Sequence, residues 1–382
     1  MSGLRGVLVR RLEDLQAYRQ AWDELAVVTR RPYCSPAWVL SWWQHVRPPQ
    51  AALRTVVVLD GNDLVGVAPI FADLGVGGIV RHRLMGSSRR DFLVAPELEE
   101  EATDVVAGVL GASEPSPDVF MLEGVPTDRR WPQLLTQRWP ARRMTLHRQF
   151  TQLAPIVSLN GRTYEEWLGS KSRNFRQGMR RRLRQLEVAG ARITLTRDDS
   201  ELSADLEAFA RLHHQRWAAR GGSGVLDERV QRMLEDCSRA LIGQLRFRLW
   251  SIKAGDETIS SHIFLSAGGE TTYWLGGFDE QWGRLQPGIV TIFAAIQHAF
   301  SVGDRRLDLG VGGQAYKYRF SDAEDHLDST LLVRSGLKAP LARSQMLRAR
   351  TRMALAERLP TSTKRRARHP LRLMTPWRRW ST

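Results

Sequence analysis

Apolar and polar positions alternate along the first 150 residues in short runs that predict strands mixed with helices. Asp60, Gly61 and Asn62 lie between two β-branched apolar runs and have the residue types of a tight turn, so they predict a hairpin. The predicted elements are, in chain order, strand 7–10, helices 12–28 and 36–45, strands 53–59, 64–71 and 78–84, helix 97–111 and strand 119–122.

The second half of the chain repeats this kind of order and has the clearest helical period. Five apolar residues between positions 164 and 189 recur at steps of three, four or seven, namely Leu168, Phe175, Met179, Leu183 and Leu186. The predicted elements are strand 152–158, helix 164–189, strand 192–196, helices 202–220 and 226–242, strands 245–253, 258–266 and 271–278, helix 288–302, and strands 306–309 and 329–334.

Both halves therefore show the order β-α-α-β-β-β-α-β, which predicts an α/β chain built from two copies of one architecture. A length of 382 residues, which is more than one hydrophobic core usually takes, agrees with two domains. We place them at residues 1–150 and 151–335. Residues 336–382 form a basic tail rich in arginine and tryptophan.

Composition narrows the location and the chemistry. No apolar run approaches the roughly 20 residues that cross a bilayer, and charged residues interrupt the start of the chain before a signal peptide could form. We expect a cytoplasmic protein. Cys34 and Cys237 have no cysteine or histidine at ligand spacing, so neither a disulfide nor a metal site is predicted.

The net charge of +15 is concentrated in the tail, which has 13 lysines and arginines against one acidic residue from Gly336 onward. The run from Lys364 to Arg368, with Trp377 and Trp380, is typical of a weak contact with the inner face of a membrane. A charged end without a partner explains it equally well. Nucleic acid is a third candidate for the tail.

A second basic run covers the predicted helix 164–189, with Arg176 and the triplet Arg180, Arg181 and Arg182 among its cations. This face is either solvated or a phosphate-binding surface for an acidic substrate, such as a nucleotide sugar, an anionic glycan or tRNA.

Short motifs connect the second half to a known family. They are His213–Trp217, Gly277–Asp279, Gln286–Gly288, Leu307–Gly310 and Tyr316–Phe320, and the first half adds Ser35–Trp38, Ser41–Trp43, Val65–Pro69 and Asp91–Phe92. Together they resemble the CelD-like (BioF2-like) acetyltransferases, a GNAT branch associated with surface polysaccharide genes and distantly related to the FemAB aminoacyltransferases.

The resemblance implies tandem GNAT-like domains with mixed, largely antiparallel sheets, the first of them degenerate. It implies transfer of an acyl group from acetyl-CoA or another acyl-CoA to an amine or hydroxyl of a sugar, a polysaccharide precursor or a related metabolite. The donor would contact Leu275, Gly276, Gln286, Gly288 and Ile289. The stretch from Gly283 to Gly288 departs from the glycine-rich loop of the family, since one glycine lies at the helix start.

Acyl transfer needs a base, donors for the oxyanion and an acid for the thiolate. Tyr316 follows the strand after which GNAT enzymes place a tyrosine acid. Asp308 and Asp279 end strands and could act as a base, while Lys317 belongs to the family motif and is one of only five lysines. Packing and loop hydrogen bonds are the alternatives for these residues.

His262 lies in the middle of a strand and could act as a base. His213 lies on the apolar face of a helix and could do the same, although packing explains both histidines as well. For the acceptor we expect contacts with Arg319, Trp217 and Arg176. Two other functions remain open, a catalytically inactive GNAT-fold binding protein in polysaccharide assembly and a FemAB-like transferase that uses aminoacyl-tRNA.

Overall fold

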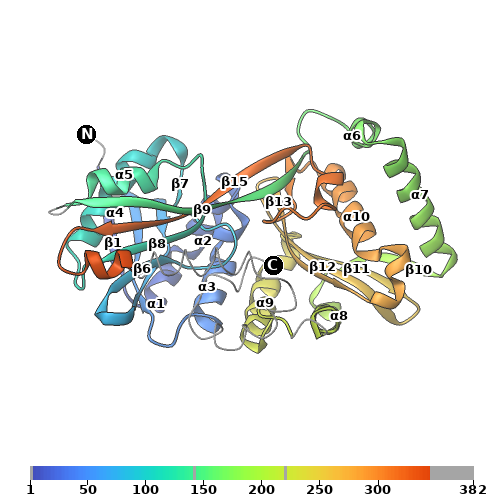
Figure 1. Ribbon diagram of the computed structural model, residues 1–382, viewed down its shortest axis with the longest axis horizontal. Helices are drawn as coiled ribbons and strands as arrows, with labels where there is room; N and C mark the ends of the chain where they lie inside the picture. Colours follow the sequence, from blue (N-terminus) through green and yellow to red (C-terminus); the bar gives the residue numbers. More distant parts are fainter. Residues whose placement is uncertain (1–2, 141–142, 219–221, 345–382) are drawn as a thin grey trace. The chain divides into compact units, whose positions relative to one another are not determined.

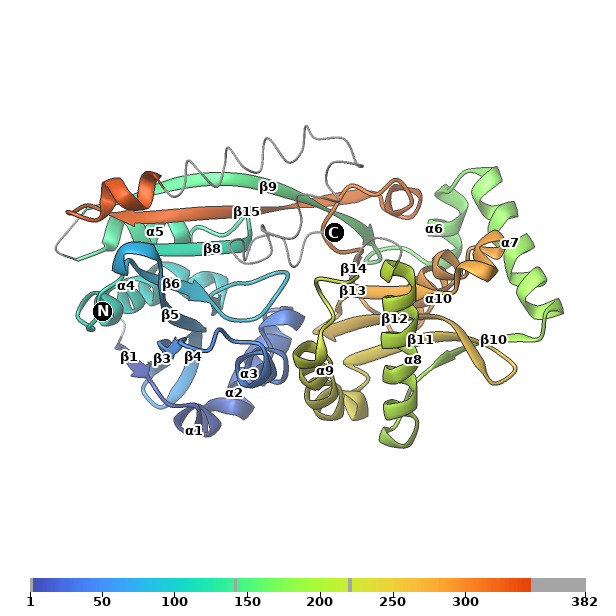
Figure 2. The same ribbon diagram turned by 60° about the horizontal axis from the view of Figure 1, so that its bottom comes forward.

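The computed structural model describes residues 3–140, 143–218 and 222–344, and the chain forms two compact units. Unit 1 takes in the chain up to Leu25, Arg47–Gln152 and the described part of the chain from His326. Unit 2 takes in Ala26–Val46 and Leu153–Asp325. Figures 1 and 2 show the elements of each. The tail motif at Lys364–Arg368, with Trp377 and Trp380, lies outside the described residues.

Unit 1 contains antiparallel strand pairs and one parallel pair. A four-stranded sheet has the order β1 (Leu4–Val9), β3 (Thr55–Asp60), β4 (Asp63–Ala68) and β7 (Leu93–Val94). A second set has the order β8 (Val119–Pro126), β6 (Val80–Leu84), β5 (Ile70–Leu74) and β2 (Ala52–Leu53), in which β8 and β6 are parallel. The helical segments are α1 (Leu12–Leu15), η1 (Gln16–Tyr18), α2 (Arg19–Val28), η3 (Val76–Gly78), η4 (Pro96–Leu98), α4 (Glu99–Gly111) and α5 (Trp131–Arg138).

The predicted hairpin at Asp60–Asn62 is confirmed, since β3 and β4 pair there and Gly61 adopts a φ of 58°. The single strand predicted at 64–71 is wrong. The chain forms β4 and β5 instead, which pair in different sheets on either side of Pro69. Proline has no N–H to donate to a strand partner, which favours an interruption at this position.

Unit 2 is built on a meander in which each strand pairs antiparallel with the next. The strands are β10 (Ala191–Leu195), β11 (Phe247–Ala254), β12 (Glu257–Ala267) and β13 (Glu270–Phe278). The short strand β14 (Arg306–Asp308) pairs parallel with β13 and antiparallel with β9. Two long strands, β9 (Met144–Ser158) and β15 (Ala323–Arg334), begin in one unit and end in the other. The predicted fold class, α/β with mixed and largely antiparallel sheets, is confirmed.

Helices cover both faces of this sheet (Figure 1). One face carries α8 (Asp199–Ala218) and α9 (Glu228–Leu241), and the other carries α10 (Pro287–Ser301). Helices α6 (Tyr164–Ser170) and α7 (Arg173–Val188) pack against α10 through one apolar cluster. The remaining helical segments are η2 (Pro32–Cys34), α3 (Pro36–His45), η5 (Ile242–Gln244), η6 (Glu280–Leu285) and η7 (Lys317–Arg319).

The single helix predicted at 164–189 is two helices. Lys171 is extended, with ψ of 153°, and the Ser172 hydroxyl accepts a hydrogen bond from the Phe175 amide. A serine at this position satisfies an amide that has no partner within the helix, so it starts a new helix. The apolar stripe itself is confirmed, because Met179 and Leu186 are buried in the unit 2 core.

An early segment of the chain belongs to unit 2. Helix α3 packs on α9, where His45 Nε2 lies 2.6 Å from Asp236. The Arg229 side chain donates to the carbonyl groups of His45 and Val46, which satisfies the end of α3. Within the described residues, no helix is long and apolar enough to span a bilayer.

Candidate functional site

The central feature of unit 2 is a gap between β13 and β14. The two strands pair in parallel from Glu270 and Arg306 to Thr272 and Asp308, where β14 ends. β13 continues to Phe278, and within the described residues no strand pairs with it along this edge. Beyond Thr272, the backbone donors and acceptors of β13 that do not bond to β12 therefore lie along an edge without a described partner strand.

β13 bulges at the mouth of this gap. In its pairing with β12, Tyr273 lies opposite Phe264 and Leu275 opposite Ile263, so Trp274 is the extra residue. Beyond the bulge, successive residues face opposite sides of the sheet. A Cβ on Gly276 would lie 2.4 Å from the His262 ring, and one on Gly277 would lie 2.6 Å from the backbone of α8. Both glycines thus allow close packing on the two faces.

His262 lies beneath this bulge and is 3% exposed. Neither of its ring nitrogens has a hydrogen-bond partner among the described residues, and its ring stacks on Tyr273 at 5.5 Å. Burial, with a smaller contribution from the Arg216 charge, lowers the pKa of His262 to about 3. The imidazole is therefore neutral at physiological pH and retains a donor and an acceptor for a ligand.

The start of α10 adjoins the same histidine. A Cβ on Gly288 would lie 3.2 Å from His262 Nε2. Pro287 has no N–H, and the amides of Ile289 and Val290 donate to the Gln286 carbonyl. The Gly288 amide is the remaining candidate donor for an anion at this helix end. Gln286 precedes the helix with φ of 51°, and its Oε1 is buried without a partner among the described residues.

Asp308 and Lys317 hold the loop that follows β14. Asp308, 1% exposed, accepts a hydrogen bond from the Gly310 amide at 2.8 Å. Lys317, 3% exposed, donates to the carbonyl groups of Gly310 and Val311 at 2.9 and 2.8 Å. Burial lowers the pKa of Lys317 to about 8, against the opposing effect of Asp308. Both side chains form hydrogen bonds to this loop.

Tyr316 stands beside Lys317 and is half-buried. Burial raises the pKa of its phenol, and the Arg216 charge acts in the opposite direction. Burial also raises the pKa of Tyr273 well above its usual value, with a further increase from Tyr316. Both phenols are therefore protonated at neutral pH.

The other predicted residues are more dispersed. Asp279 caps η6 by accepting a hydrogen bond from the Gln281 amide at 2.9 Å. Trp217 is half-buried, with its ring 6.2 Å from that of His213. Leu275 lies on β13 just after the bulge. Arg176 is half-buried on α7, and Arg319 is exposed at the end of η7.

Four residues that were not predicted as site residues lie near the gap. Arg216 places its guanidinium carbon 4.8 Å from the centre of the Phe278 ring. The Tyr33 hydroxyl donates to the Tyr273 carbonyl at 3.4 Å, and Trp38 packs edge-on against Trp274 at 5.6 Å. Tyr273 itself stacks on His262. The motif at Ser35–Trp38 was visible in the sequence, but its distance along the chain from β13 hid this contact.

Residues 173–318 match the family described as an acetyltransferase (GNAT) domain. The predicted resemblance to the CelD-like GNAT family and the predicted enzyme class, an acetyltransferase, are confirmed by this match. None of the curated proteins matches the chain.

Solved structures extend the likeness to both units. The crystal structure of FemX is similar with a TM-score of 0.61 and 13% identity, covering 86% of this chain and 98% of that one. The structure of L-PGS from Bacillus licheniformis is similar with a TM-score of 0.52 and 12% identity, covering 90% and 96%. At such identities the likeness concerns the fold alone.

Proposed function

From the premise that this chain carries a GNAT acetyltransferase domain, we propose that it transfers an acyl group from acyl-CoA to an amine or hydroxyl of a sugar, a polysaccharide precursor or a related metabolite. The observation that carries the proposal is the gap between β13 and β14 beyond Thr272 and Asp308. In a GNAT fold the pantetheine arm of the donor pairs with exposed strand backbone in such a gap. We place the reaction in the cytoplasm as part of the same proposal.

The donor would lie along β13, with its acyl group near the bulge. Leu275 and Gly276 supply backbone groups for the pantetheine, and the Gly288 amide, with the buried Gln286 oxygen nearby, meets the phosphate end. Ile289 contributes through its position in the first turn, since its amide donates to Gln286. This phosphate site offers fewer free backbone amides than a glycine-rich loop would provide.

The transfer forms a bond from the acceptor nitrogen or oxygen to the acyl carbon and breaks the carbon–sulfur bond. The acceptor loses a proton, and the leaving thiolate gains one. Tyr316 supplies the proton to the thiolate, because its phenol is protonated at neutral pH, and the phenolate that remains regains a proton from the acceptor, directly or through solvent. His262, neutral and without a described partner, hydrogen-bonds a reacting group. Asp308 and Lys317 position the loop beside it.

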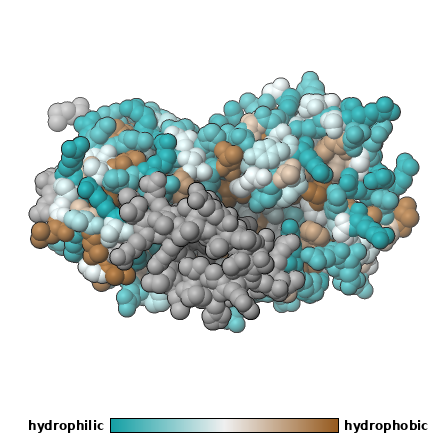
Figure 3. Space-filling model, in the orientation of Figure 1, coloured by the Kyte–Doolittle hydropathy of each residue, from teal (hydrophilic) through white to brown (hydrophobic). Residues whose placement is uncertain are grey.

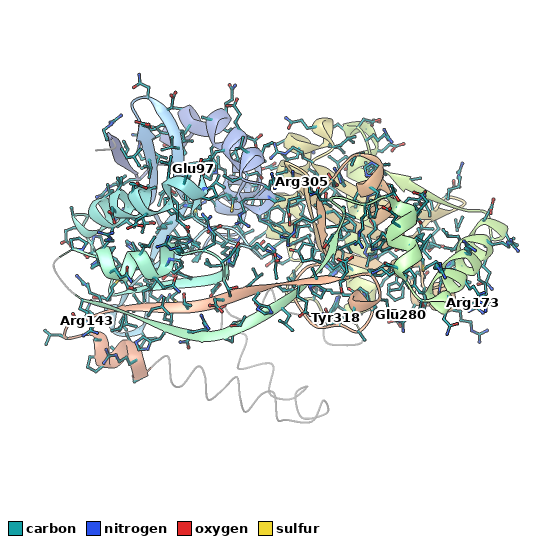
Figure 4. All side chains as sticks on the ribbon, turned by 90° about the horizontal axis from the view of Figure 1, so that it is seen from above. Glu97, Arg143, Arg173, Glu280, Arg305 and Tyr318 are labelled. Carbon is teal, nitrogen blue, oxygen red and sulfur yellow. The ribbon has the colours of Figure 1, made fainter. Side chains whose placement is uncertain are left out.

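An inactive binding protein is the second candidate function. The small number of free amides at the proposed phosphate site favours it. A tRNA-dependent transferase is the third. Helix α7 supports that candidate because six arginines and one glutamate lie along it, and no ion pair with these arginines occurs among the described residues. The surface over α7 is largely hydrophilic in Figure 3, and Figure 4 labels Arg173, the first residue of α7.

The test separates donor binding from chemistry. Wild type should bind acetyl-CoA in a calorimetric titration and release free thiol with a panel of amino sugars. Tyr316→Phe should bind acetyl-CoA as well as wild type, while kcat falls roughly 100-fold because the thiolate loses its proton donor.

Tyr318→Phe is the matched control, since Tyr318 lies two residues further along the chain and is 41% exposed, and its kcat should remain that of wild type. Absence of binding by wild type to any of a panel of acyl-CoAs would overturn the transferase proposal and favour the binding-protein or tRNA functions.

A further inference from the structure

Arg216 is a cation of α8 that lies beside Phe278, the last residue of β13. It lies in the last turn of α8, on the face of the sheet opposite α10. Its side chain is half-buried, and its guanidinium carbon lies 4.8 Å from the centre of the Phe278 ring. Stacking on an aromatic face fixes the orientation of the guanidinium and leaves its N–H groups free to meet a ligand edge-on.

No carboxylate pairs with Arg216 within the part of the chain that the structure describes. Two other arginines of the same unit are paired with carboxylates. Arg248, 7% exposed, forms an ion pair with Asp304, and Arg306 pairs with both Glu270 and Asp325. Arg216 therefore differs from these structural arginines, because its charge is partly removed from water without a partner.

The groups around Arg216 at the gap are neutral. Its charge acts on the pKa values of His262, His213, Tyr273 and Tyr316, in each case as a contribution smaller than that of burial. Burial lowers the pKa of His213 to about 4, so this histidine is also uncharged at neutral pH. The four side chains are polar and neutral, and none of them compensates a positive charge.

We propose that Arg216 forms an anion subsite at the gap and binds a phosphate or carboxylate group of a substrate. A planar guanidinium suits either group because it can donate two parallel hydrogen bonds. The anion belongs either to the acyl acceptor or to the phosphates of the acyl donor. The inference rests on the proposed function, since it assigns a ligand group to the same site.

The acceptor arm of the experiment uses a matched pair of amino sugars, glucosamine and glucosamine 6-phosphate, titrated without acyl donor. Wild type should bind the phosphorylated sugar roughly 10- to 100-fold more tightly than the unphosphorylated one, as a charge-assisted pair predicts. Arg216→Gln should lose this preference, and Arg216→Lys should keep part of it because the charge remains.

The donor arm compares acetyl-CoA with acetylpantetheine, which has no phosphate. If the anion belongs to the donor, Arg216→Gln weakens acetyl-CoA binding by a similar factor and leaves acetylpantetheine unchanged. Arg211→Gln is the control for net charge, since Arg211 lies on the same helix and donates to the Thr258 carbonyl. It should behave as wild type in both arms.

Equal affinity of wild type and Arg216→Gln in both arms overturns the anion subsite, whatever the transfer assay gives. The proposed transfer fails separately, if the anion preference is present but no acceptor in the panel releases thiol from acetyl-CoA. A loss of affinity in Arg211→Gln equal to that in Arg216→Gln would also overturn the subsite, because general charge would then explain the effect.

Discussion

The buried charged groups of unit 1 and the polar groups at the strand gap of unit 2 follow opposite patterns. In unit 1, Arg90 and Arg83 share Glu123, and Arg129 pairs with Asp91 at 3.0 Å. In unit 2, Arg216 has no counter-ion and His262 has no hydrogen-bond partner among the described residues. Polar groups that satisfy one another stabilise a fold, whereas groups left open beside a gap are suited to a ligand.

His82 of unit 1 is an exception to this contrast, because it is also a buried histidine without a described partner. Like His262, it is buried with both ring nitrogens unpartnered among the described residues, and burial lowers its pKa to about 3. Its strand, however, is paired on both sides, with Ala72 of β5 and Phe120 of β8 opposite His82. An unpartnered histidine therefore indicates a site only where a gap such as that beside β13 gives a ligand access.

The largest effect is expected from breaking the unit 1 network. Glu123→Gln leaves Arg83 and Arg90 buried with reduced compensation, so the free energy of unfolding should fall by roughly 3–5 kcal/mol. Denaturant unfolding measures it. Glu100→Gln is the control, because the Glu100 side chain is 46% exposed and its pair with Arg138 should contribute less than about 1 kcal/mol. Similar losses in both variants would contradict the contrast.

Lys317, beside the gap, should make the free energy of unfolding depend on pH. Its pKa is about 8 in the folded protein and 10.5 when unperturbed, so between these values the unfolded chain binds the proton that the folded chain has released. Stability from this group therefore rises with pH, by at most about 3 kcal/mol.

The measurement compares unfolding of wild type and Lys317→Met from pH 7 to pH 10, so that other titrating groups cancel. The stability of wild type relative to the variant should increase across this range. A constant difference would show that Lys317 keeps its ordinary pKa on folding.

The next largest loss of stability is expected where Gly276 packs closely against His262. In Gly276→Ala the new Cβ meets the imidazole at 2.4 Å, so the variant should lose about 1–3 kcal/mol of stability and bind acetyl-CoA more weakly. The double variant Gly276→Ala with His262→Ala should regain stability relative to Gly276→Ala, as a double-mutant cycle would show. Additive losses would mean that the two side chains do not compete for this space.

The smallest effect is expected on the exposed face of α7. Arg180→Gln and Arg184→Gln remove cations that have no described ion pair, so stability should change by less than about 0.5 kcal/mol. Acetyl-CoA affinity should also stay unchanged in calorimetry. A clear loss of donor affinity would place the phosphate end of the donor against α7 and broaden the site beyond the gap.

Sequence patterns predicted much of the fold because local rules determine it. The turn at Gly61, the apolar stripe through Met179 and Leu186, and the meander of β11 to β13 follow from spacing and turn chemistry. The errors fell where one residue changes the outcome, as Pro69 does between β4 and β5 and Ser172 does before α7. The division into domains at residues 150 and 335, and the roles of the site residues, stay predictions.

The amino-acid sequence by itself determined most of the order of elements and the resemblance to GNAT acetyltransferases, because short motifs and periodicity are local properties of the chain. Only the tertiary structure decided which polar groups are left open. Arg216 lies within the motif His213–Trp217, but nothing in that motif shows that Arg216 lacks a counter-ion among the described residues while Arg248 is paired with Asp304. Arg216 lacks a described counter-ion, and Trp38 contacts Trp274, because folding brings together segments that are far apart in the sequence. Burial and pairing depend on contacts between segments that are distant in the sequence, so only the tertiary structure shows them.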